Sequence, residues 1–415
     1  MGIEIRAVAA DEMRDLVRVV LTAFGKEATE ERLADEEVWA EPDRCLGAVD
    51  EGRFVASAAA YSFDLTLPGG ATAPVAAVSW VGVLPTHRRQ GLLTGMMRFQ
   101  LEDVVARGES MAVLTASEAR IYGRFGYGPA TRLAKVRVDT RGGLDTIAEQ
   151  AAGGRLRMID AADQTEVARP VYDRVRHQRV GEVSRPDSSW AYAALDRESD
   201  REGWSHRFCV AHEDSAGAVD GYAFYRVKDE WDLNRPGGGV KLLDVCADDP
   251  EVESALLAFA ADVDLTVSVE TWARPLDDWW PLRLTDLRRY RVELIHEHLW
   301  VRILDVEAAL SARTYEHSGE VVLGVDDPFR SATSGRYRLV VKDDGVGSCE
   351  RIGSLHDGDA DAFVGIDGLG ALYLGDWRPS QLELGGRLRP SSDDALDRLD
   401  RVFASRRSPF CTTEF

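Results

Sequence analysis

The sequence predicts an α+β fold built from three consecutive domains. Its 415 residues exceed what one hydrophobic core usually supports, since domains hold about 100 to 150 residues. Helix-type and strand-type patterns alternate in the first third of the chain, and a similar order returns in the middle third, before short strands and turns take over. We therefore expect domains at residues 1–150, 151–295 and 296–415.

The first domain begins with a helix and continues as a series of strands. In DEMRDLVRVVLTAF, which starts at Asp11, apolar residues recur with the helical period. Residues 44–85 predict three strands, separated by turns at 50–52 and 68–70. A second periodic stretch predicts a helix from Gly91 to about Arg107, and MAVLTAS after it predicts a buried strand. This helix would cross over between two strands, which favours parallel pairing.

The middle domain repeats this order with a change of charge. FCVAHEDSAGAVDGYAFYRVKDEWDL resembles the earlier hairpin LGAVDEGRFVASAAAYSFDL, and GGGVKLLDVCADDPEVESALLAFAAD repeats strand, short loop and helix. The first loop has basic residues and a glycine, whereas the second has Asp248, Asp249, Pro250 and Glu251. Carboxylates there repel a phosphate, so we expect the second copy to lack any phosphate-binding function.

The last domain is predicted to hold short strands and one final helix. The strands are expected in GEVVLGVDDPF, GRYRLVVKDDGVGSCERI and DAFVGIDGLGALYLG. Ser392 is a suitable N-cap for the helix, and Arg406 and Arg407 suit its last turn. The sequence closes with SPFCTTEF, whose apolar and β-branched residues predict a docked strand.

Composition and charge restrict the partners of this protein. It has 50 Lys and Arg against 71 Asp and Glu, a formal charge of −21, so nucleic acid and anionic membranes are poor partners and a cationic substrate is a suitable one. Solubility alone is the alternative explanation for this acidity. No run of about 18 apolar residues could span a bilayer, and MGIEIRAVAADEMRDL does not resemble a secretory signal, so we expect a cytoplasmic protein.

Cysteine and histidine patterns predict neither a disulfide framework nor a metal site. The chain has an odd number of scattered cysteines without a C-x-x-C pair: Cys45, Cys209, Cys246, Cys349 and Cys411. His296 and His298 could share one face of a strand in ELIHEHLWVRIL, where we expect an exposed polar face rather than a metal site.

The stretch SWVGVLPTHRRQGLLTG predicts a phosphate site. It places a basic loop between a strand and a helix that opens at Gly91. Backbone N–H groups at a helix N-terminus are unpaired and suit a pyrophosphate, and Arg88 and Arg89 add positive charge. Gly91 has no side chain to keep a phosphate from the backbone.

This loop resembles the acyl-CoA loop R/Q-x-x-G-x-G/A of GCN5-related N-acetyltransferases, with Leu93 in place of the last small residue. One group of that superfamily, the Eis (enhanced intracellular survival) acetyltransferases, is similar to this chain in three stretches: PTHRRQGLLTGMM, SEARIYGRFGYGPAT and SPFCTTEF. In that group a leucine at the position of Leu93 is normal. The resemblance spans the whole chain. It implies an acetyltransferase domain, a degenerate acetyltransferase domain and a sterol-carrier-like domain, with acetyl-CoA as co-substrate, no metal and a homohexamer.

The resemblance also implies which residues bind acetyl-CoA. The backbone of Val81, Gly82 and Val83 would pair with the pantetheine arm as an added strand does. Ser117 and Glu118 would lie beside the thioester. The pyrophosphate would be held by the loop and the first helical turn, with Arg88 close by: Arg89, Gln90, Gly91, Leu92, Leu93 and Thr94.

Two residues are implied to act in the chemistry. Tyr122 would protonate the departing thiolate, since a phenol of pKa about 10 stays protonated at neutral pH. Without the resemblance, a buried core tyrosine is the better interpretation of Tyr122, and we assign Tyr127 to packing. The terminal carboxylate of Phe415 would serve as base or attract the ammonium, although an ordinary pKa of about 3.3 to 3.7 makes it a weak base.

The acceptor pocket is expected to be aromatic and acidic. Trp80 precedes the strand assigned to acetyl-CoA. For Trp80 and for Trp39, a place in the hydrophobic core is the alternative interpretation. The remaining candidates are Trp39, Glu27, Glu36, Glu37 and Glu414. The expected reaction is direct acetylation of a cationic amine (an aminoglycoside, a polyamine or a protein lysine) in a ternary complex. The alternative is a lipid-binding or scaffold protein with a vestigial acetyltransferase fold.

Overall fold

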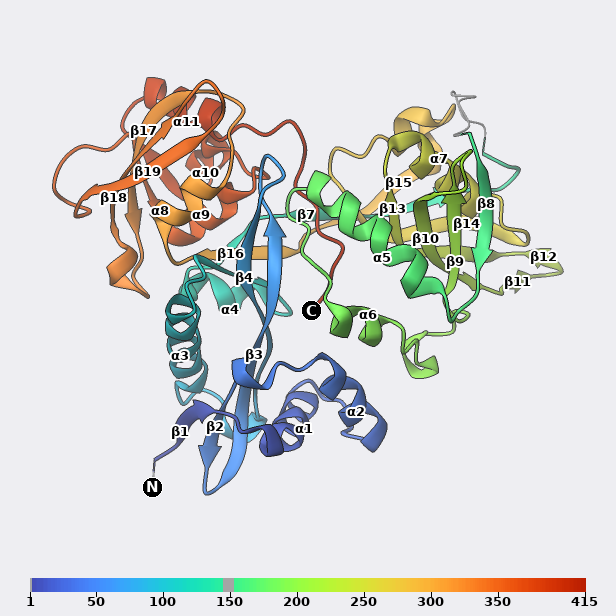
Figure 1. Ribbon diagram of the computed structural model, residues 1–415, viewed down its shortest axis with the longest axis horizontal. Helices are drawn as coiled ribbons and strands as arrows, with labels where there is room; N and C mark the ends of the chain where they lie inside the picture. The colour runs from blue at the N-terminus through green and yellow to red at the C-terminus, as the bar shows by residue number, and fades with distance from the viewer. Residues whose placement is uncertain (1, 145–152) are drawn as a thin grey trace. The chain divides into compact units, whose positions relative to one another are not determined.

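The computed structural model describes residues 2–144 and 153–415 and divides the chain into two compact units (Figure 1). The first unit comprises the residues up to Thr131, Val183–Tyr192 and His298–Phe415. The second comprises Arg132–Glu182 and Ala193–Glu297. The expected boundary between residues 150 and 151 lies outside the described residues.

The first unit contains a seven-stranded sheet in the order β1-β2-β3-β4-β5-β16-β6. The strands are β1 (Glu4–Ala7), β2 (Cys45–Asp50), β3 (Arg53–Thr66), β4 (Thr72–Val83), β5 (Met111–Thr115), β6 (Gly128–Pro129) and β16 (Leu299–Ile303). Helix α3 (Leu92–Ala106) connects β4 to β5, which pair in parallel. The crossover helix and its parallel strands are therefore confirmed.

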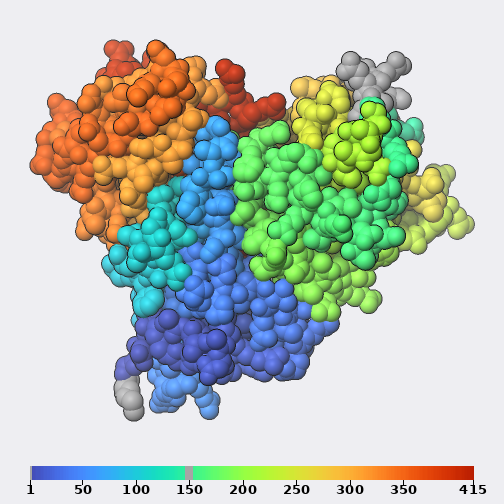
Figure 2. All heavy atoms as spheres, in the orientation of Figure 1, coloured from blue at the N-terminus to red at the C-terminus, as the bar shows by residue number. Residues whose placement is uncertain are grey.

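Helices cover both faces of this sheet. Alternate residues of a strand point to opposite faces, so Leu46, Ala58 and Val78 face α3, whereas Cys45 and Ala59 face α1 (Met13–Ala23) and α2 (Glu30–Trp39). Figure 1 shows α3 on one side of β3 and β4 with α1 on the other, and Figure 2 shows the outer side of α3 at the surface. The predicted stripe of α1 is buried as expected: Met13, Leu16, Val17, Val20 and Leu21.

The second unit repeats this sheet in the order β8-β9-β10-β13-β14-β7-β15. Its strands are β8 (Arg155–Ile159), β9 (Phe208–Glu213), β10 (Val219–Lys228), β13 (Gly238–Ala247), β14 (Thr266–Arg274), β7 (Arg132–Asp139) and β15 (Tyr290–Glu297). Helix α7 (Pro250–Ala261) crosses from β13 to the parallel β14, and α5 (Gln164–Val175) is its second long helix. The predicted repeat is confirmed.

The two sheets exchange strands along the chain. β7 directly follows β6 yet belongs to the second sheet, and β16 directly follows β15 yet inserts between β5 and β6 of the first. The break falls between His296 in β15 and His298, which is buried. The expectation that both histidines share one exposed strand face is therefore wrong, because the strand ends between them.

The C-terminal region of the first unit is a five-stranded sheet with four helices. The sheet order is β19-β18-β17-β20-β21, with β17 (Gly319–Asp326), β18 (Gly335–Val341), β19 (Gly347–Gly353), β20 (Ala362–Gly365) and β21 (Leu388–Pro390). The helices are α8 (Val306–Ala312), α9 (Ile366–Tyr373), α10 (Pro379–Leu384) and α11 (Asp393–Val402).

Two expectations for this region need correction, and one is confirmed. The Ser392 side chain accepts a hydrogen bond from Ala395 N–H and caps α11 as predicted. DAFVGIDGLGALYLG forms only the short strand β20 before it becomes α9. Arg406 and Arg407 lie beyond the end of α11 rather than in its last turn.

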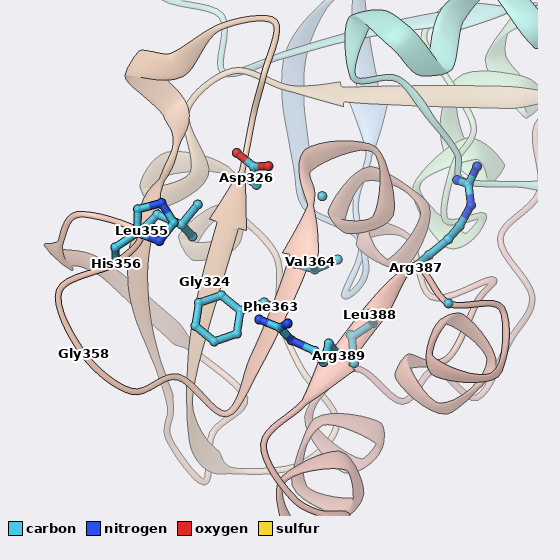
Figure 3. Close-up of a pocket in the computed structure, with 12 residues that line it drawn as sticks. Gly324, Asp326, Leu355, His356, Gly358, Phe363, Val364, Arg387, Leu388 and Arg389 are labelled. Atoms are coloured by element: carbon cyan, nitrogen blue, oxygen red, sulfur yellow. The ribbon is translucent and has the colours of Figure 1, made fainter.

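A pocket of about 500 Å³ lies over β17, β20 and β21 in this region (Figure 3). The Phe363 ring covers Gly324 of the neighbouring strand, and the Arg389 guanidinium carbon lies 5.3 Å from the centre of that ring. Asp326 and Arg387 also line the pocket and carry charge. The lining mixes these charged groups with apolar side chains, namely Leu355, Val364 and Leu388.

Within residues 2–144 and 153–415, no helix is long and apolar enough to cross a membrane. Across the same residues, no three His, Cys, Asp or Glu side chains gather in a group that could hold a metal ion. All five cysteines lie within the described residues, are buried and form no disulfide.

Candidate active site

The N-terminus of α3 is open where the sequence predicts a phosphate site. Gly91 occupies the N-cap position with a φ of 82°, and no side chain caps the helix. A Cβ built on Gly91 would meet no atom within 4 Å, so space is free in front of the helix. Arg89 is exposed and makes no ion pair with any described residue, whereas the Arg88 Nε donates to the Val83 carbonyl over 3.3 Å. The arrangement suits a phosphate, because unpaired N–H groups and a free guanidinium face open space.

A β-bulge in β4 lies next to this loop. Ser57 pairs with Gly82 and Ala59 with Ser79, so Trp80 and Val81 together oppose one residue of β3. Trp80 has a φ of 53°, and its carbonyl accepts a hydrogen bond of 2.8 Å from the buried Ser57 hydroxyl. An extra residue reverses the side-chain alternation of a strand. Trp80 therefore packs with α1, whereas Val78 and Val81 pack with α3.

The pairing between β4 and β5 ends early. It includes Ala76 with Ala112 and Ala77 with Val113, and the later residues of the two strands do not pair with each other. The backbone edge of Val81 to Val83 that faces away from β3 is consequently not used by β5. An extended ligand could pair with this edge, as the prediction for the pantetheine arm requires. Ser117 and Glu118 are exposed directly after β5.

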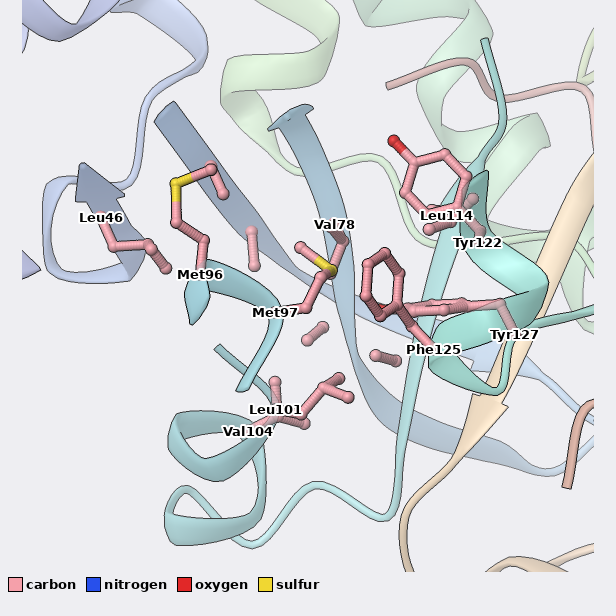
Figure 4. Packing of buried hydrophobic residues seen from close by; sticks show 14 of the residues in the cluster. Leu46, Val78, Met96, Met97, Leu101, Val104, Leu114, Tyr122, Phe125 and Tyr127 are labelled. Carbon is pink, nitrogen blue, oxygen red and sulfur yellow. The ribbon is translucent and has the colours of Figure 1, made fainter. Parts of the chain in front are cut away.

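Tyr122 and Tyr127 differ in their surroundings although their rings lie 6.0 Å apart. Tyr122 ends the short helix α4 (Ala119–Tyr122), and burial, helped by the charge of Glu118, raises the pKa of its phenol to about 12. Figure 4 shows its hydroxyl pointing away from the labelled core residues. Tyr127 is fully buried, and its hydroxyl finds no hydrogen-bond partner among the described residues. The geometry therefore leaves Tyr122 as the candidate acid and Tyr127 as a packing residue.

The turn that carries Tyr122 rests on residues from the far end of the chain. A Cβ on Gly126 would lie 2.8 Å from the guanidinium carbon of Arg302 in β16, and a Cβ on Gly128 would lie 1.8 Å from the Asp367 carbonyl of α9. Arg302 is itself paired with Asp327 over 2.6 Å, and both side chains are 0% exposed. The C-terminal region therefore supports the turn, and only glycine fits these two positions.

The chain terminus lies at the end of β5. Thr115, the last residue of β5, donates from its hydroxyl to a carboxyl-terminal oxygen of Phe415 over 3.3 Å. The Phe415 and Phe63 rings pack edge to face, with 5.3 Å between their centres. Residues 408–415 form no strand, so the expectation of a docked strand is wrong. Phe410, Cys411 and Thr413 are nevertheless buried, and the Arg185 side chain donates to the hydroxyls of Thr412 and Thr413.

An aromatic cluster joins the terminus to the first helices on the α1 face of the sheet. Trp39 contacts Tyr61 at 5.1 Å and Tyr192 at 5.0 Å between ring centres. Tyr61 in turn contacts Trp80 at 6.3 Å and Phe63 at 6.0 Å. Sequence reasoning missed Tyr61, Phe63 and Tyr192. The alternation in AYSFDL contained a signal for the first two, since residues 59, 61 and 63 share one strand face.

Glu36 is the acidic residue of this cluster. It is half-buried, and burial raises the pKa of its carboxyl, an effect that Lys26 and hydrogen bonds from Tyr192 and Trp80 only partly offset. The Tyr192 hydroxyl lies 3.4 Å from its Oε1. The other acidic candidates, Glu27, Glu37 and Glu414, are exposed, and Glu37 lies 3.4 Å from Arg14. A carboxylate among aromatic rings is a suitable environment for an ammonium group.

Models of known families match three segments of the chain. An acetyltransferase (GNAT) domain model matches residues 4–130, and a second acetyltransferase (GNAT) domain model matches residues 181–303. A sterol carrier protein domain model matches residues 306–412. The predicted fold class, two acetyltransferase domains followed by a sterol-carrier-like domain, is confirmed by these matches.

Whole proteins are similar as well. An uncharacterized N-acetyltransferase of Streptomyces avermitilis is 38% identical over 99% of both chains. The N-acetyltransferase Eis of Mycobacterium tuberculosis is 34% identical over 86% of this chain and 85% of its own. The crystal structure of Eis1 from Mycobacterium abscessus superimposes with a TM-score of 0.87 at 33% identity and covers both chains fully.

Proposed function

Because the chain belongs to the Eis family of GCN5-related N-acetyltransferases, we propose that this N-acetyltransferase moves an acetyl group from acetyl-CoA directly to an amine of a cationic substrate. The observation that supports it most is the position of Phe415. Its terminal carboxyl group accepts a hydrogen bond from the Thr115 hydroxyl at the end of β5, where β4 and β5 no longer pair, and its ring contacts Phe63 of the aromatic cluster.

The donor half of the proposed site is the open start of α3 together with the free edge of β4. Arg89 and the N–H groups after Gly91 would hold the pyrophosphate, and the backbone of Val81 to Val83 would pair with the pantetheine arm. Because β4 and β5 run parallel, the end of β4 and the start of α3 lie at the same edge of the sheet as the end of β5. The thioester would then lie near Ser117 and Glu118.

In the reaction the neutral amine attacks the thioester carbon, and the C–S bond breaks as the C–N bond forms. A backbone N–H near Val81 would stabilise the negative charge on the carbonyl oxygen. The Tyr122 pKa of about 12 lies above an ordinary thiol pKa of about 8.5, so complete proton transfer to the thiolate is uphill in the free enzyme. The first contribution of Tyr122 is therefore a hydrogen bond to sulfur, and its proton follows as CoA leaves.

The acceptor half is the aromatic cluster with Glu36. An ammonium group would be attracted by this carboxylate and by the faces of Trp39 and Trp80. The terminal carboxylate of Phe415 would receive the proton that the amine loses, directly or through water. Aminoglycosides, polyamines and protein lysines all carry suitable amines.

Two measurements test this function. Acetyl-CoA at millimolar concentration should raise the melting temperature, since a ligand at 100 times its Kd stabilises by about 2.7 kcal/mol. Thiol release should then be measured with aminoglycosides, polyamines and lysine peptides, while denatured mass spectrometry looks for an acetylated enzyme. Thiol release without an acetyl-enzyme supports direct transfer. Absence of both the thermal shift and thiol release would support the lipid-binding or scaffold alternative.

We also propose a homohexamer without affinity for nucleic acid. The formal charge of −21 opposes binding to nucleic acid. Light scattering coupled to size-exclusion chromatography measures the assembly, and a monomer of 45.8 kDa would contradict the proposal.

A further inference from the structure

A short segment of the chain, Val183–Tyr192, leaves the second unit and belongs to the first. Val183 forms a bridge with Leu65 at the end of β3. The Ser184 N–H donates to the Asp64 carbonyl over 2.9 Å, and its hydroxyl accepts from the Asp64 N–H over 2.8 Å. These bonds fix the backbone immediately before Arg185 to the sheet that holds the candidate site.

From this position Arg185 holds the end of the chain. Its Nε donates to the Thr413 hydroxyl over 2.9 Å, and one terminal nitrogen donates to the Thr412 hydroxyl over 2.9 Å. Its guanidinium carbon lies 5.5 Å from the centre of the Trp190 ring in the same segment. The Arg185 side chain is thus placed by its own segment and holds two consecutive residues of the C-terminal segment 408–415, called the tail below.

We propose that Arg185 is the positioning residue for the terminal carboxylate of Phe415. The argument rests on the proposed function, in which that carboxylate takes part in acetyl transfer. Arg185 holds the tail at Thr412 and Thr413, and Thr115 holds it at Phe415. The Arg185 anchor fixes the orientation of the two residues that lead to the terminal carboxylate, which the Thr115 contact does not reach.

The chemistry of arginine suits this task. Its planar guanidinium presents donors in a fixed fork, so two hydroxyls can be held at once in a defined orientation. Lysine offers a compact point charge on a flexible stem and fixes only a position. A displacement of about 1 Å of a reacting group can cost about 10²-fold in rate, so loss of this fork should reduce turnover rather than acetyl-CoA binding.

The kinetic test compares Arg185→Ala and Arg185→Lys with Arg338→Ala as matched control. Arg338 lies on β18, and its ion-pair partners are Glu320 over 2.7 Å and Glu350 over 3.5 Å rather than residues of the tail. Arg185→Ala should lower kcat by about 10- to 100-fold with the KM for acetyl-CoA unchanged, Arg185→Lys should recover part of the loss, and Arg338→Ala should behave as wild type. Unchanged kcat in Arg185→Ala would overturn the proposal.

A double-mutant cycle separates the anchor from a general loss of structure. Thr413→Val keeps the shape of the side chain and removes the hydroxyl that Arg185 binds. If the contact carries the effect, Arg185→Ala combined with Thr413→Val should lose little more than Arg185→Ala alone. Fully additive losses would overturn the proposal. Should Arg185→Ala fail to fold, Arg185→Lys and Thr413→Val give the same comparison.

A second readout does not depend on activity. A carboxypeptidase that removes C-terminal aromatic residues should release Phe415 faster from Arg185→Ala than from wild type or Arg338→Ala, as followed by intact mass. Equal release rates would contradict an anchor. If wild type acetylates no amine, the proposed function fails, and the digestion still decides whether Arg185 holds the tail.

Discussion

Helices α3 and α7 occupy the same place in two sheets of the same strand order, and they begin in opposite ways. α3 begins after Gly91 without a capping side chain and with exposed arginines before it. α7 begins with Pro250, and the Asp249 side chain accepts from the Val252 N–H over 2.9 Å. Glu253 in its first turn pairs with the buried Arg274 over 2.7 Å.

The comparison teaches what makes such a helix a binding site. At α7 the protein supplies its own anions, so the partial positive charge of the helix start is already satisfied. At α3 no side chain caps the helix, so the partial positive charge of its start is not satisfied, and Gly91 leaves room for a ligand. The two domains share a fold, whereas only the first keeps the features that the proposed function uses.

The largest effect should come from a change to the tail, residues 408–415, which belongs to the same unit as α3. One alanine added after Phe415 moves the terminal carboxylate by one residue, so acetyl transfer should fall by at least about 10²-fold. The thermal shift caused by acetyl-CoA should remain, because the donor half is untouched. Wild-type rates of thiol release from the extended protein would remove the terminus from the mechanism.

The pair Tyr122 and Tyr127 gives the next largest effect. Tyr122→Phe removes the hydroxyl assigned to the leaving sulfur and should lower kcat by about 10²- to 10⁴-fold. Tyr127→Phe is the matched control, because its buried hydroxyl bonds to none of the described residues. Steady-state kinetics on both variants checks the assignment, and equal losses would contradict it.

A smaller effect is expected when α3 is given the charge pattern of α7. Gly91→Asp places a carboxylate before the helix and should weaken acetyl-CoA binding by about 10- to 100-fold, measured by calorimetry. Gly91→Asn is the control, since asparagine tolerates the φ of 82° about as well as aspartate does and adds no charge. If both variants lose the same affinity, backbone strain rather than charge is responsible.

The smallest effect should come from the opposite change at α7. Asp249→Ala removes an N-cap and should lower the free energy of unfolding by about 1 kcal/mol, measured by chemical denaturation. Acetyl-CoA binding and thiol release should not change. If this variant binds an anion at the start of α7, the Asp249 carboxylate alone, rather than the whole loop, had prevented anion binding there.

Elements with strong local signals were predictable from the sequence. The apolar stripe of α1, the crossover α3 and the Ser392 cap follow from periodicity and capping chemistry, which depend on neighbours in sequence. The open loop at Gly91 was predictable for the same reason. Tyr122 could be chosen over Tyr127 only through the family resemblance.

Features that depend on tertiary packing were not predictable. Nothing local indicates the bulge that turns Trp80 toward α1, because it is defined by pairing with β3. Arg185 and Tyr192 lie in sequence within the second acetyltransferase match yet in space beside the first site. Residues 408–415 favour a strand by composition, whereas in the structure they form none and Arg185 binds the hydroxyls of Thr412 and Thr413.

The exchanged strand β16 has a consequence for biosynthesis. A ribosome makes the residues of β5 and β6 long before Leu299–Ile303, which later insert between them. Until then the nascent first sheet has an unpaired edge at β5, and such edges invite aggregation. Translation must therefore pass residue 303 before this half of the protein can close, and a truncated product that stops after Thr131 should be a client for chaperones rather than a small working enzyme.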